Sequence, residues 1–476
     1  MKVTSFPFLA INKEFRKFES LDVWKQFKHS SNNNNNNRSH DSVLPWYFAV
    51  SINRMPAKYL ISKSVPCNIT DLRLATEEEL WKEHRSLTNN FLQTWKAVRL
   101  DDLNTISDLS LQKRPSLMDL NVELVKRMLT HCNFCRWNCQ VDRSSNETVG
   151  EDGNGVREKI KNKHGTCQLE SASNVSSYFH HRGEELVFRG NMGSGTIFFT
   201  SCNMRCSFCQ NGDISTDKNN GIPITPNLLA LMIWQLRMEG CHNTNWVGGD
   251  PTIHLHTIVQ AINMLDSFKM PNTIIKKEKQ EDLEYIERIK ADNNFGNYFS
   301  AWKMNSQYAF YQKRFFNSPQ LWNSNFFMSD ETMCILRSLI DAWLPDFKFG
   351  PGKCALDLSR TPWYWETVTK NLKLIHEWGE DFVIRHLIMP NHVECCTKPV
   401  LEWIARNMPE VPINIMDQYY PDNLCDPSSS KYRERYGEIA RSPTKEEVVR
   451  SYQYAKDLGL NFEALSYEKS VFGLNA

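Results

Sequence analysis

The fold and the chemistry of this chain are decided by one stretch, Ser201-Cys202-Asn203-Met204-Arg205-Cys206-Ser207-Phe208-Cys209-Gln210. Its cysteines have the spacing C-x3-C-x2-C, and three thiolates this close can hold three irons of a cubane cluster and leave the fourth iron open. The alternatives are a structural zinc loop and three unrelated core cysteines. Zinc takes four tetrahedral ligands, and the next candidates along the chain are Cys241 and His242. The spacing therefore favours an iron–sulfur cluster over zinc.

The residues immediately before this stretch predict a buried strand. Gly195 to Thr200 is a run of β-branched and aromatic residues, GTIFFT. The three cysteines should therefore lie on the loop that leaves the carboxyl end of a strand. Barrel-type α/β proteins place their chemistry at that end.

Downstream of the cysteines, predicted strands alternate with predicted helices. The expected strands cover residues 244–247, 320–325, 342–348, 382–388 and 412–416. The expected helices cover 228–238, 363–378 and 397–406, with one more that starts near 330 and another that carries the apolar residues Ile258, Ile262 and Leu265. A last helix is expected to start at Ser442, with Pro443 in its first turn, and to end at Gly459. Such alternation predicts parallel β/α units, closed or partly closed. A charged, aromatic insertion near 267–316 interrupts it, and its charge run at 276–282 predicts a solvated helix.

Polar residues stand where each predicted strand ends, and ligands of parallel β/α folds collect there. The second strand ends in Gly248-Gly249-Asp250, whose glycines let a ligand approach the backbone and whose carboxylate could hold an ammonium group. The later strands end, in order, in Asn323 and Asn325, in Asp346 and Lys348, in Arg385 and His386, and in Asp417 and Gln418. Beside a cluster, this set could hold a zwitterionic ligand that carries a ribose.

The N-terminal part of the chain is expected to be peripheral at first and then helical. Residues 1–45 should be disordered or peripheral, because the asparagine tract at 32–37 offers nothing that packs in a core. Residues 46–131 should form a mainly helical extension, with a capping box at Thr76 and a second helix over 117–130.

A second group of cysteines lies in residues 132–190. Cys132, Cys135 and Cys139 have the spacing C-x2-C-x3-C, and Cys167 is a candidate fourth ligand beyond a polar insertion. The group predicts a second metal site, with zinc and an auxiliary iron–sulfur cluster as open alternatives. Free thiols are the third alternative.

Composition narrows the class of protein. The 14 cysteines of this 476-residue chain come largely in close groups, which favours metal or redox sites over disulfides. The 56 basic and 55 acidic residues leave a net charge of +1, which argues against nucleic-acid binding driven by bulk charge. No apolar run is long enough for a transmembrane helix, and membrane association is not expected. The N-terminus shows no cleavage pattern, so a cytoplasmic location is the default and a mitochondrial one the alternative.

With these motifs in place, the sequence resembles the radical S-adenosylmethionine superfamily, and within it the uncharacterised branch related to pyruvate formate-lyase activating enzymes. The resemblance starts from the three-cysteine motif and covers residues 132–465. The other matching stretches are 194–199, 209–211, 247–252, 322–325, 344–348, 385–387 and 416–419. The three-cysteine motif with the Gly-Gly-acid turn is specific for the superfamily. The assignment to the branch rests on longer but less specific matches.

The resemblance implies a partial (βα)6 TIM-like barrel over residues 191–476, with a [4Fe-4S] cluster on Cys202, Cys206 and Cys209. S-adenosylmethionine would chelate the open iron, and its reductive cleavage would produce a 5′-deoxyadenosyl radical that abstracts hydrogen from an unknown substrate. The protein would then be an activating-enzyme-like oxidoreductase. It would need an electron donor such as a flavodoxin or a ferredoxin-type reductant, and a protein substrate is one option.

By the same resemblance, Asp250 would accept from the methionyl ammonium group and Asn323 and Asn325 would face the ribose. Lys348 or Arg385 would bind the carboxylate. The chain departs from the superfamily in carrying Asp rather than Glu after Gly-Gly and in its long insertion. The metal of the N-terminal cysteines does not carry over from the resemblance.

One rival from another class stays open: a non-catalytic zinc or iron–sulfur protein in which both cysteine groups only hold structure. A further motif, Asn391-His392-Val393-Glu394-Cys395-Cys396, follows the fifth predicted strand. Its adjacent cysteines could relay a radical or form a disulfide, and an ordinary loop role is equally consistent with the sequence.

Overall fold

The computed structural model describes residues 44–100, 115–144, 148–151, 157–160, 164–268, 309–312 and 314–466. All of them belong to one compact unit, Leu44–Ala476. The asparagine tract at 32–37, the charge run at 276–282 and most of the insertion near 267–316 lie outside the described residues. The predictions for these segments stay predictions.

Six parallel strands of the described chain form the frame of the fold. Four of them pair side by side in the order β4 (Ser194–Phe199), β6 (Thr244–Gly248), β9 (Gln320–Ser324) and β10 (Ala342–Pro345). The last two, β11 (Ile384–Leu387) and β12 (Ile413–Met416), pair with each other. Parallel bridges from Trp343 to Phe382 and from Asp346 to Arg385 join β10 to the edge of β11. The strands thus run in chain order, which confirms the predicted partial barrel.

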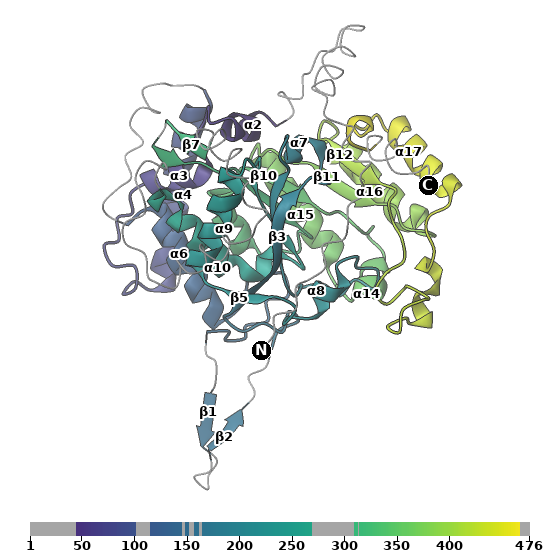
Figure 1. Ribbon diagram of the computed structural model, residues 1–476, viewed down its shortest axis with the longest axis horizontal. Coiled ribbons are helices and arrows are strands. Elements are labelled where there is room, and N and C mark those ends of the chain that lie inside the picture. The colour runs from purple at the N-terminus through teal and green to yellow at the C-terminus, as the bar shows by residue number, and fades with distance from the viewer. Residues whose placement is uncertain are drawn as a thin grey trace, which may run out of the picture. The chain divides into compact units, whose positions relative to one another are not determined.

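Helices connect these strands and surround them (Figure 1). They are α9 (Pro226–Met238), α10 (Leu255–Met264), α13 (Asp330–Arg337), α15 (Tyr364–Glu377), α16 (Lys398–Asn407) and α17 (Lys445–Asp457). The predicted start of the last helix is wrong, because Thr444 caps it and forms a capping box with Glu447. Pro443 therefore stands before the helix, and the threonine side chain determines where it begins.

Two antiparallel strands that the sequence pattern did not indicate extend the sheet beyond β4. They are β3 (Ser173–His181), which pairs with β4, and β5 (Ile222–Ile224), which pairs with β3. The sequence of β3, SNVSSYFHH, lacks the alternation of apolar and polar residues that predicts a strand, and most of its side chains are half-exposed. Within the polar insertion at 144–163, β1 (Thr148–Glu151) and β2 (Arg157–Ile160) form an antiparallel hairpin.

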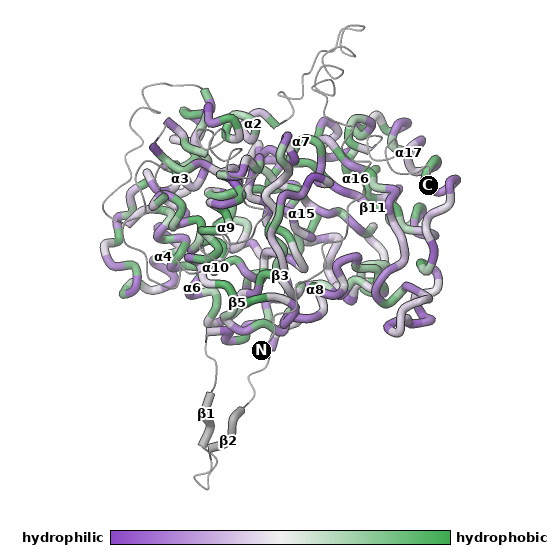
Figure 2. The backbone as a smooth tube through the Cα atoms, in the orientation of Figure 1, coloured by the Kyte–Doolittle hydropathy of each residue, from purple (hydrophilic) through white to green (hydrophobic). Residues whose placement is uncertain are grey.

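The N-terminal extension is helical, as predicted, with α2 (Pro45–Ser51), α3 (Lys58–Ser64), α4 (Glu77–Arg99) and α6 (Leu117–Thr130). The predicted capping box at Thr76 opens α4, and α6 packs against both α4 and α10. One hydrophobic core runs from these helices into the barrel, and its apolar residues are prominent in α9 and α10 (Figure 2). Among the described helices, none combines the length and the apolarity needed to cross a bilayer.

Candidate active site

The three predicted cluster cysteines lie together on the loop that leaves β4. Ser201 turns the chain out of the strand with a φ of 63°, and its hydroxyl donates to the Cys167 carbonyl at 2.5 Å. Burial, followed by the charges of Asp250 and Cys206, raises the pKa of Cys202 well above its ordinary value. Burial also raises the pKa of Cys206 to about 12. These thiols are therefore protonated when free, and a metal that binds them must displace their protons.

The surroundings of the three thiols are compatible with an iron–sulfur cluster. Cys202 Sγ accepts hydrogen bonds from the Met204 backbone at 3.3 Å and from the Asn325 amide at 3.6 Å. Hydrogen bonds to cysteine sulfur are one means by which proteins tune iron–sulfur clusters. Across the described residues, the groups of three or more donor atoms that all lie within 4.8 Å do not include this triplet. The three sulfurs therefore do not all lie within 4.8 Å of one another, whereas the ligands of one tetrahedral zinc lie closer together.

The two glycines of the Gly-Gly-Asp turn lie directly against the cysteine loop. A Cβ on Gly249 would stand 1.6 Å from the Ser201 carbonyl oxygen, and one on Gly248, whose φ is 127°, would stand 2.2 Å from the Phe199 nitrogen. The Gly249 backbone also donates to Phe199 O at 2.8 Å. The observed reason for these glycines is thus close packing on the chain that carries the cysteines. Approach of a ligand to their backbone stays a prediction.

Asp250, the predicted ammonium acceptor, is buried and already bound on both carboxylate oxygens. Oδ1 accepts from the Thr252 backbone and Oδ2 from the Asn325 backbone, each at 2.9 Å. Burial raises its pKa to about 6, although these hydrogen bonds favour the charged form. Asp250 therefore connects the end of β6 to the end of β9. Each oxygen keeps a further lone pair, so the ammonium role is open to it.

The two asparagines predicted to face a ribose point toward different groups. The Asn325 amide donates to Cys202 Sγ and, at 2.7 Å, to Asn203 Oδ1. Asn323 donates to Glu184 at 3.3 Å and accepts from Arg385. Asn325 thus lies beside the cysteine loop and Asn323 belongs to a charged network in the barrel. Contact of either with a ribose stays a prediction.

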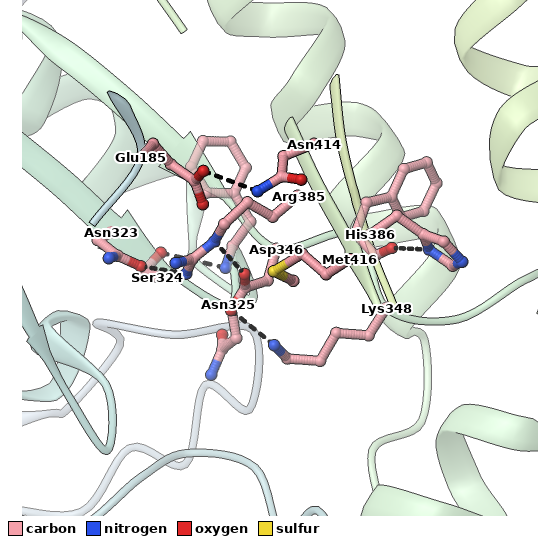
Figure 3. A network of polar contacts seen from close by, with 12 residues as sticks. Glu185, Asn323, Ser324, Asn325, Asp346, Lys348, Arg385, His386, Asn414 and Met416 are labelled. Carbon is pink, nitrogen blue, oxygen red and sulfur yellow. Dashed lines mark hydrogen bonds and ion pairs between the residues drawn. The ribbon is translucent and has the colours of Figure 1, made fainter. Parts of the chain in front are cut away.

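That network centres on Asp346, which lies between the other two predicted charged residues (Figure 3). Asp346 accepts from Arg385 Nε at 2.8 Å and from Lys348 Nζ at 2.6 Å. Burial opposes the charged form of Asp346, but Arg385 and Lys348 outweigh it and lower its pKa. Burial likewise opposes the charge on Lys348, while Asp346 and the nearby Cys206 raise its pKa above the ordinary value. Lys348 therefore lies on the side of the cysteines.

Two buried acids complete the network, and the sequence pattern gave no sign of them. Glu184 and Glu185 precede the short helix α7 (Leu186–Arg189) between β3 and β4, and they are 3% and 1% exposed. Glu184 Oε1 lies 3.7 Å from Arg385 Nη1, and Glu185 accepts from the Asn414 amide at 2.7 Å. An Arg-Gly-Glu-Glu sequence is typical of a surface turn. Only the fold places these carboxylates opposite Arg385.

His386, also predicted at a strand end, supports the fold of this region. Its Nδ1 lies 2.7 Å from the Phe347 carbonyl and its Nε2 lies 2.9 Å from the Thr397 hydroxyl. Burial lowers its pKa to about 4, so the ring is neutral.

The N-terminal cysteines lie beside the loop that carries Cys202, because Trp137, between Cys135 and Cys139, donates to the Asn203 carbonyl at 2.6 Å. Cys132 and Cys139 share a thiol hydrogen bond that, ahead of the charge of Arg143, lowers the pKa of Cys132 to about 5. The charges of Cys132 and Cys167 contribute, after burial, to a raised pKa of Cys135. The fold thus gathers the four predicted ligands. The sulfur atoms of these four cysteines do not all lie within 4.8 Å of one another. The identity of a metal at this site stays open.

Four metal-donor atoms that all lie within 4.8 Å of one another do occur elsewhere in the described residues. They belong to Cys354, His392, Cys395 and Cys396. The sequence motif at 391–396 contains three of them, but the fourth lies 41 residues before Cys395 and nothing near it in sequence indicated a ligand.

Comparisons with known proteins identify similar chains. Residues 196–300 match the family described as the Radical SAM superfamily. The uncharacterized protein MJ0674 of Methanocaldococcus jannaschii is 31% identical over 421 residues, which cover 87% of this chain and 97% of that protein.

Solved structures show weaker likeness. SuiB of Streptococcus suis bound to S-adenosylmethionine aligns with 55% of this chain at 12% identity and a TM-score of 0.32. A domain of a pyruvate-formate lyase-activating enzyme from Bacteroides vulgatus aligns with 30% of this chain and 80% of its own, at 17% identity and a TM-score of 0.23. This chain spans 48% of the length of SuiB. At these scores neither likeness carries an argument about function.

Proposed function

Because the chain belongs to the radical SAM superfamily and to the family of MJ0674, we propose that it holds a [4Fe-4S] cluster on Cys202, Cys206 and Cys209 and cleaves S-adenosylmethionine. The observation that carries the proposal is the placement of the three thiols on the loop after β4, with the Gly-Gly-Asp turn packed directly against that loop. The triplet offers three ligands, which leaves one iron for S-adenosylmethionine.

When bound, the cluster and S-adenosylmethionine together would supply a 5′-deoxyadenosyl radical that abstracts hydrogen from the substrate. The chain's own residues would position and protect these groups. Asn325 would direct its amide at Cys202 Sγ, and Asp250 would hold the Asn325 backbone in place. The buried setting of Cys202 would keep water from the sulfur and strengthen nearby electrostatic interactions.

Within the charged network, Lys348 is the better candidate to bind the carboxylate of S-adenosylmethionine. Its pKa responds to the charge of Cys206, so its ammonium group lies near the cluster ligands. Arg385 instead contacts Asp346, Asn323 and Glu184 inside the barrel. We expect Arg385 to hold the network together.

The reaction class that best agrees with the resemblance is that of an activating-enzyme-like oxidoreductase. Its substrate would be a glycyl residue on another protein or a small molecule, and its electron donor a flavodoxin or ferredoxin-type reductant. A non-catalytic zinc or iron–sulfur protein is the rival, and the experiment below separates the two.

The test is anaerobic reconstitution of the full chain with iron and sulfide. We expect a brown protein with about four irons on the triplet, which forms 5′-deoxyadenosine from S-adenosylmethionine after reduction with dithionite. Changing Cys202, Cys206 and Cys209 to Ala should abolish S-adenosylmethionine cleavage and lower the iron content by about four per chain, whereas the matched variant Cys334→Ala, at an exposed cysteine of α13, should retain both. A colourless protein that holds only zinc and leaves S-adenosylmethionine intact would overturn the proposal.

A further inference from the structure

Four side chains outside the candidate active site converge on one point, and we propose that they bind a single zinc ion. The ligand atoms of Cys354, His392, Cys395 and Cys396 all lie within 4.8 Å of one another. Cys354 Sγ lies 3.6 Å from Cys395 Sγ, and His392 Nδ1 lies 3.2 Å from the same sulfur. Around a tetrahedral zinc with Zn–S bonds of about 2.3 Å, neighbouring sulfurs stand about 3.8 Å apart. The donors are therefore already at ligation spacing.

The fold brings these donors from two loops at the carboxyl ends of β10 and β11. Cys354 is the first residue of α14 (Cys354–Ser359), and the other three donors follow β11. Val393–Thr397 is a single π-helical turn, in which the Thr397 backbone donates to His392 O at 3.2 Å. Such turns are rare and are frequent at functional sites. Here the turn gathers His392 and both cysteines on one side of the loop.

Gly350 allows the first loop to approach the second. A Cβ at this position would stand 2.1 Å from the Cys395 carbonyl oxygen, and it would meet backbone rather than a flexible side chain. Any larger residue would push Cys354 away from the other donors. The close approach of the two loops is thus built into the backbone.

The imidazole of His392 has the orientation expected of a metal ligand. Its Nδ1 faces the thiols, while Nε2 lies 3.6 Å from Glu438 Oε1. A carboxylate beside the second ring nitrogen is the usual support for a histidine that binds zinc. Asn391 fixes the loop beside it, since its amide donates to the Glu438 carbonyl at 2.6 Å.

The number and spacing of these donors favour one zinc ion over an iron–sulfur cluster. An iron–sulfur cluster separates its cysteine sulfurs by its own width, and donors all within 4.8 Å leave room for one ion. Three thiols and one imidazole complete a tetrahedron without an open position, which is typical of structural rather than catalytic zinc. All three cysteines are free thiols in this structure.

The position of α14 indicates what the ion would hold. The Leu358 carbonyl accepts from the Ser207 backbone at 2.8 Å, and the Ser359 carbonyl accepts from Arg205 at 3.0 Å. The end of α14 therefore binds the loop that carries Cys202, Cys206 and Cys209. A helix of six residues has little stability of its own. A zinc at Cys354 would anchor this helix and, through it, the cysteine loop.

The first test measures zinc in the full chain with Cys202, Cys206 and Cys209 changed to Ala, so that it does not depend on the proposed function. Adding Cys354→Ser should lower the zinc content by about one ion per chain, whereas Cys334→Ser should leave it unchanged. Zinc X-ray absorption should show a site with three sulfur ligands and one nitrogen ligand. Equal zinc content in the two serine variants would overturn the proposal.

The second test needs no variant and cannot fail through misfolding. In the zinc-loaded wild-type chain, the exposed Cys395 should resist N-ethylmaleimide, whereas the exposed Cys334 should react. A chelator should expose Cys395, and added zinc should protect it again. Reaction of Cys395 as fast as Cys334 in the zinc-loaded protein, or a disulfide among the three cysteines, would contradict the assignment.

Discussion

The carboxylate of Asp250 accepts the backbone N–H of Asn325 at 2.9 Å, and the Asn325 side chain donates in turn to Cys202 Sγ at 3.6 Å. The end of β6 is thereby connected through the end of β9 to a proposed cluster ligand. The acid after Gly-Gly thus positions the side chain that donates to Cys202 Sγ, and a role for Asp250 in ligand binding stays a prediction.

The first prediction concerns the amide beside Cys202. Asn325→Asp keeps the oxygen that accepts from the Phe327 backbone at 3.0 Å but replaces the N–H donor with a carboxylate. Negative charge next to the sulfur opposes reduction of a cluster, so we expect a more negative midpoint potential and slower S-adenosylmethionine cleavage. Redox titration followed by electron paramagnetic resonance measures the shift. Asn407→Asp on α16 is the matched control, and equal potentials in the two variants would refute the role.

The second prediction concerns the Gly-Gly turn. Gly249→Ala places a Cβ 1.6 Å from the Ser201 carbonyl, and because both partners are backbone the loop must move. We expect the free energy of unfolding to fall by about 3 kcal/mol, the upper end of the range typical of overpacking, and we expect poor cluster assembly. Gly352→Ala, with nothing within 4 Å of the added Cβ, should behave like wild type. Thermal unfolding and iron content after reconstitution compare the two variants, and a stable, fully loaded Gly249→Ala protein would show that the packing is not required.

The third prediction concerns the charged network in the barrel. Arg385→Gln removes the guanidinium group that lies between the buried carboxylates of Asp346 and Glu184 and leaves Lys348 as the cation beside Asp346, so we expect a destabilisation of about 3–5 kcal/mol. Arg406→Gln removes a pair with Glu402 whose arginine side chain is 74% exposed, and should change stability by about 0.5 kcal/mol or less. Chemical denaturation measures both. Similar values for the two variants would mean that the interior pair contributes no more than a surface pair.

The fourth prediction concerns pH. Burial lowers the pKa of His84 on α4 from 6.5 to about 4, so the folded protein holds this ring neutral while the unfolded chain binds a proton below pH 6.5. Stability should therefore fall as the pH drops through 6.5 toward 4. Between pH 7.5 and 5.5 the wild type should lose about 1.4 kcal/mol relative to His84→Gln. Denaturation at the two pH values measures the difference, and parallel pH profiles would rule out this histidine as the cause.

Features that depend on neighbouring residues were predictable. The helix at 117–130 and the capping box at Thr76 follow from side chains within a few residues of one another, and the structure confirms both. The start of the last helix depends on equally local side chains, and its prediction at Ser442 was wrong because Thr444, and not Ser442, has a glutamate three residues later with which it forms a capping box. The half-exposed strand β3 has no strong pattern of its own, and pairing with β4 holds it in the sheet.

The sequence by itself determined the chemical class of this protein, because three cysteines within eight residues lie close together and a Gly-Gly-acid turn follows the next predicted strand. Only the tertiary structure decided which distant groups meet. It placed Glu184 opposite Arg385 and joined Cys354 to His392, Cys395 and Cys396. The physical reason is that contacts between loops depend on how whole strands and helices pack. Residues far apart in the chain carry no local periodicity that records such a contact.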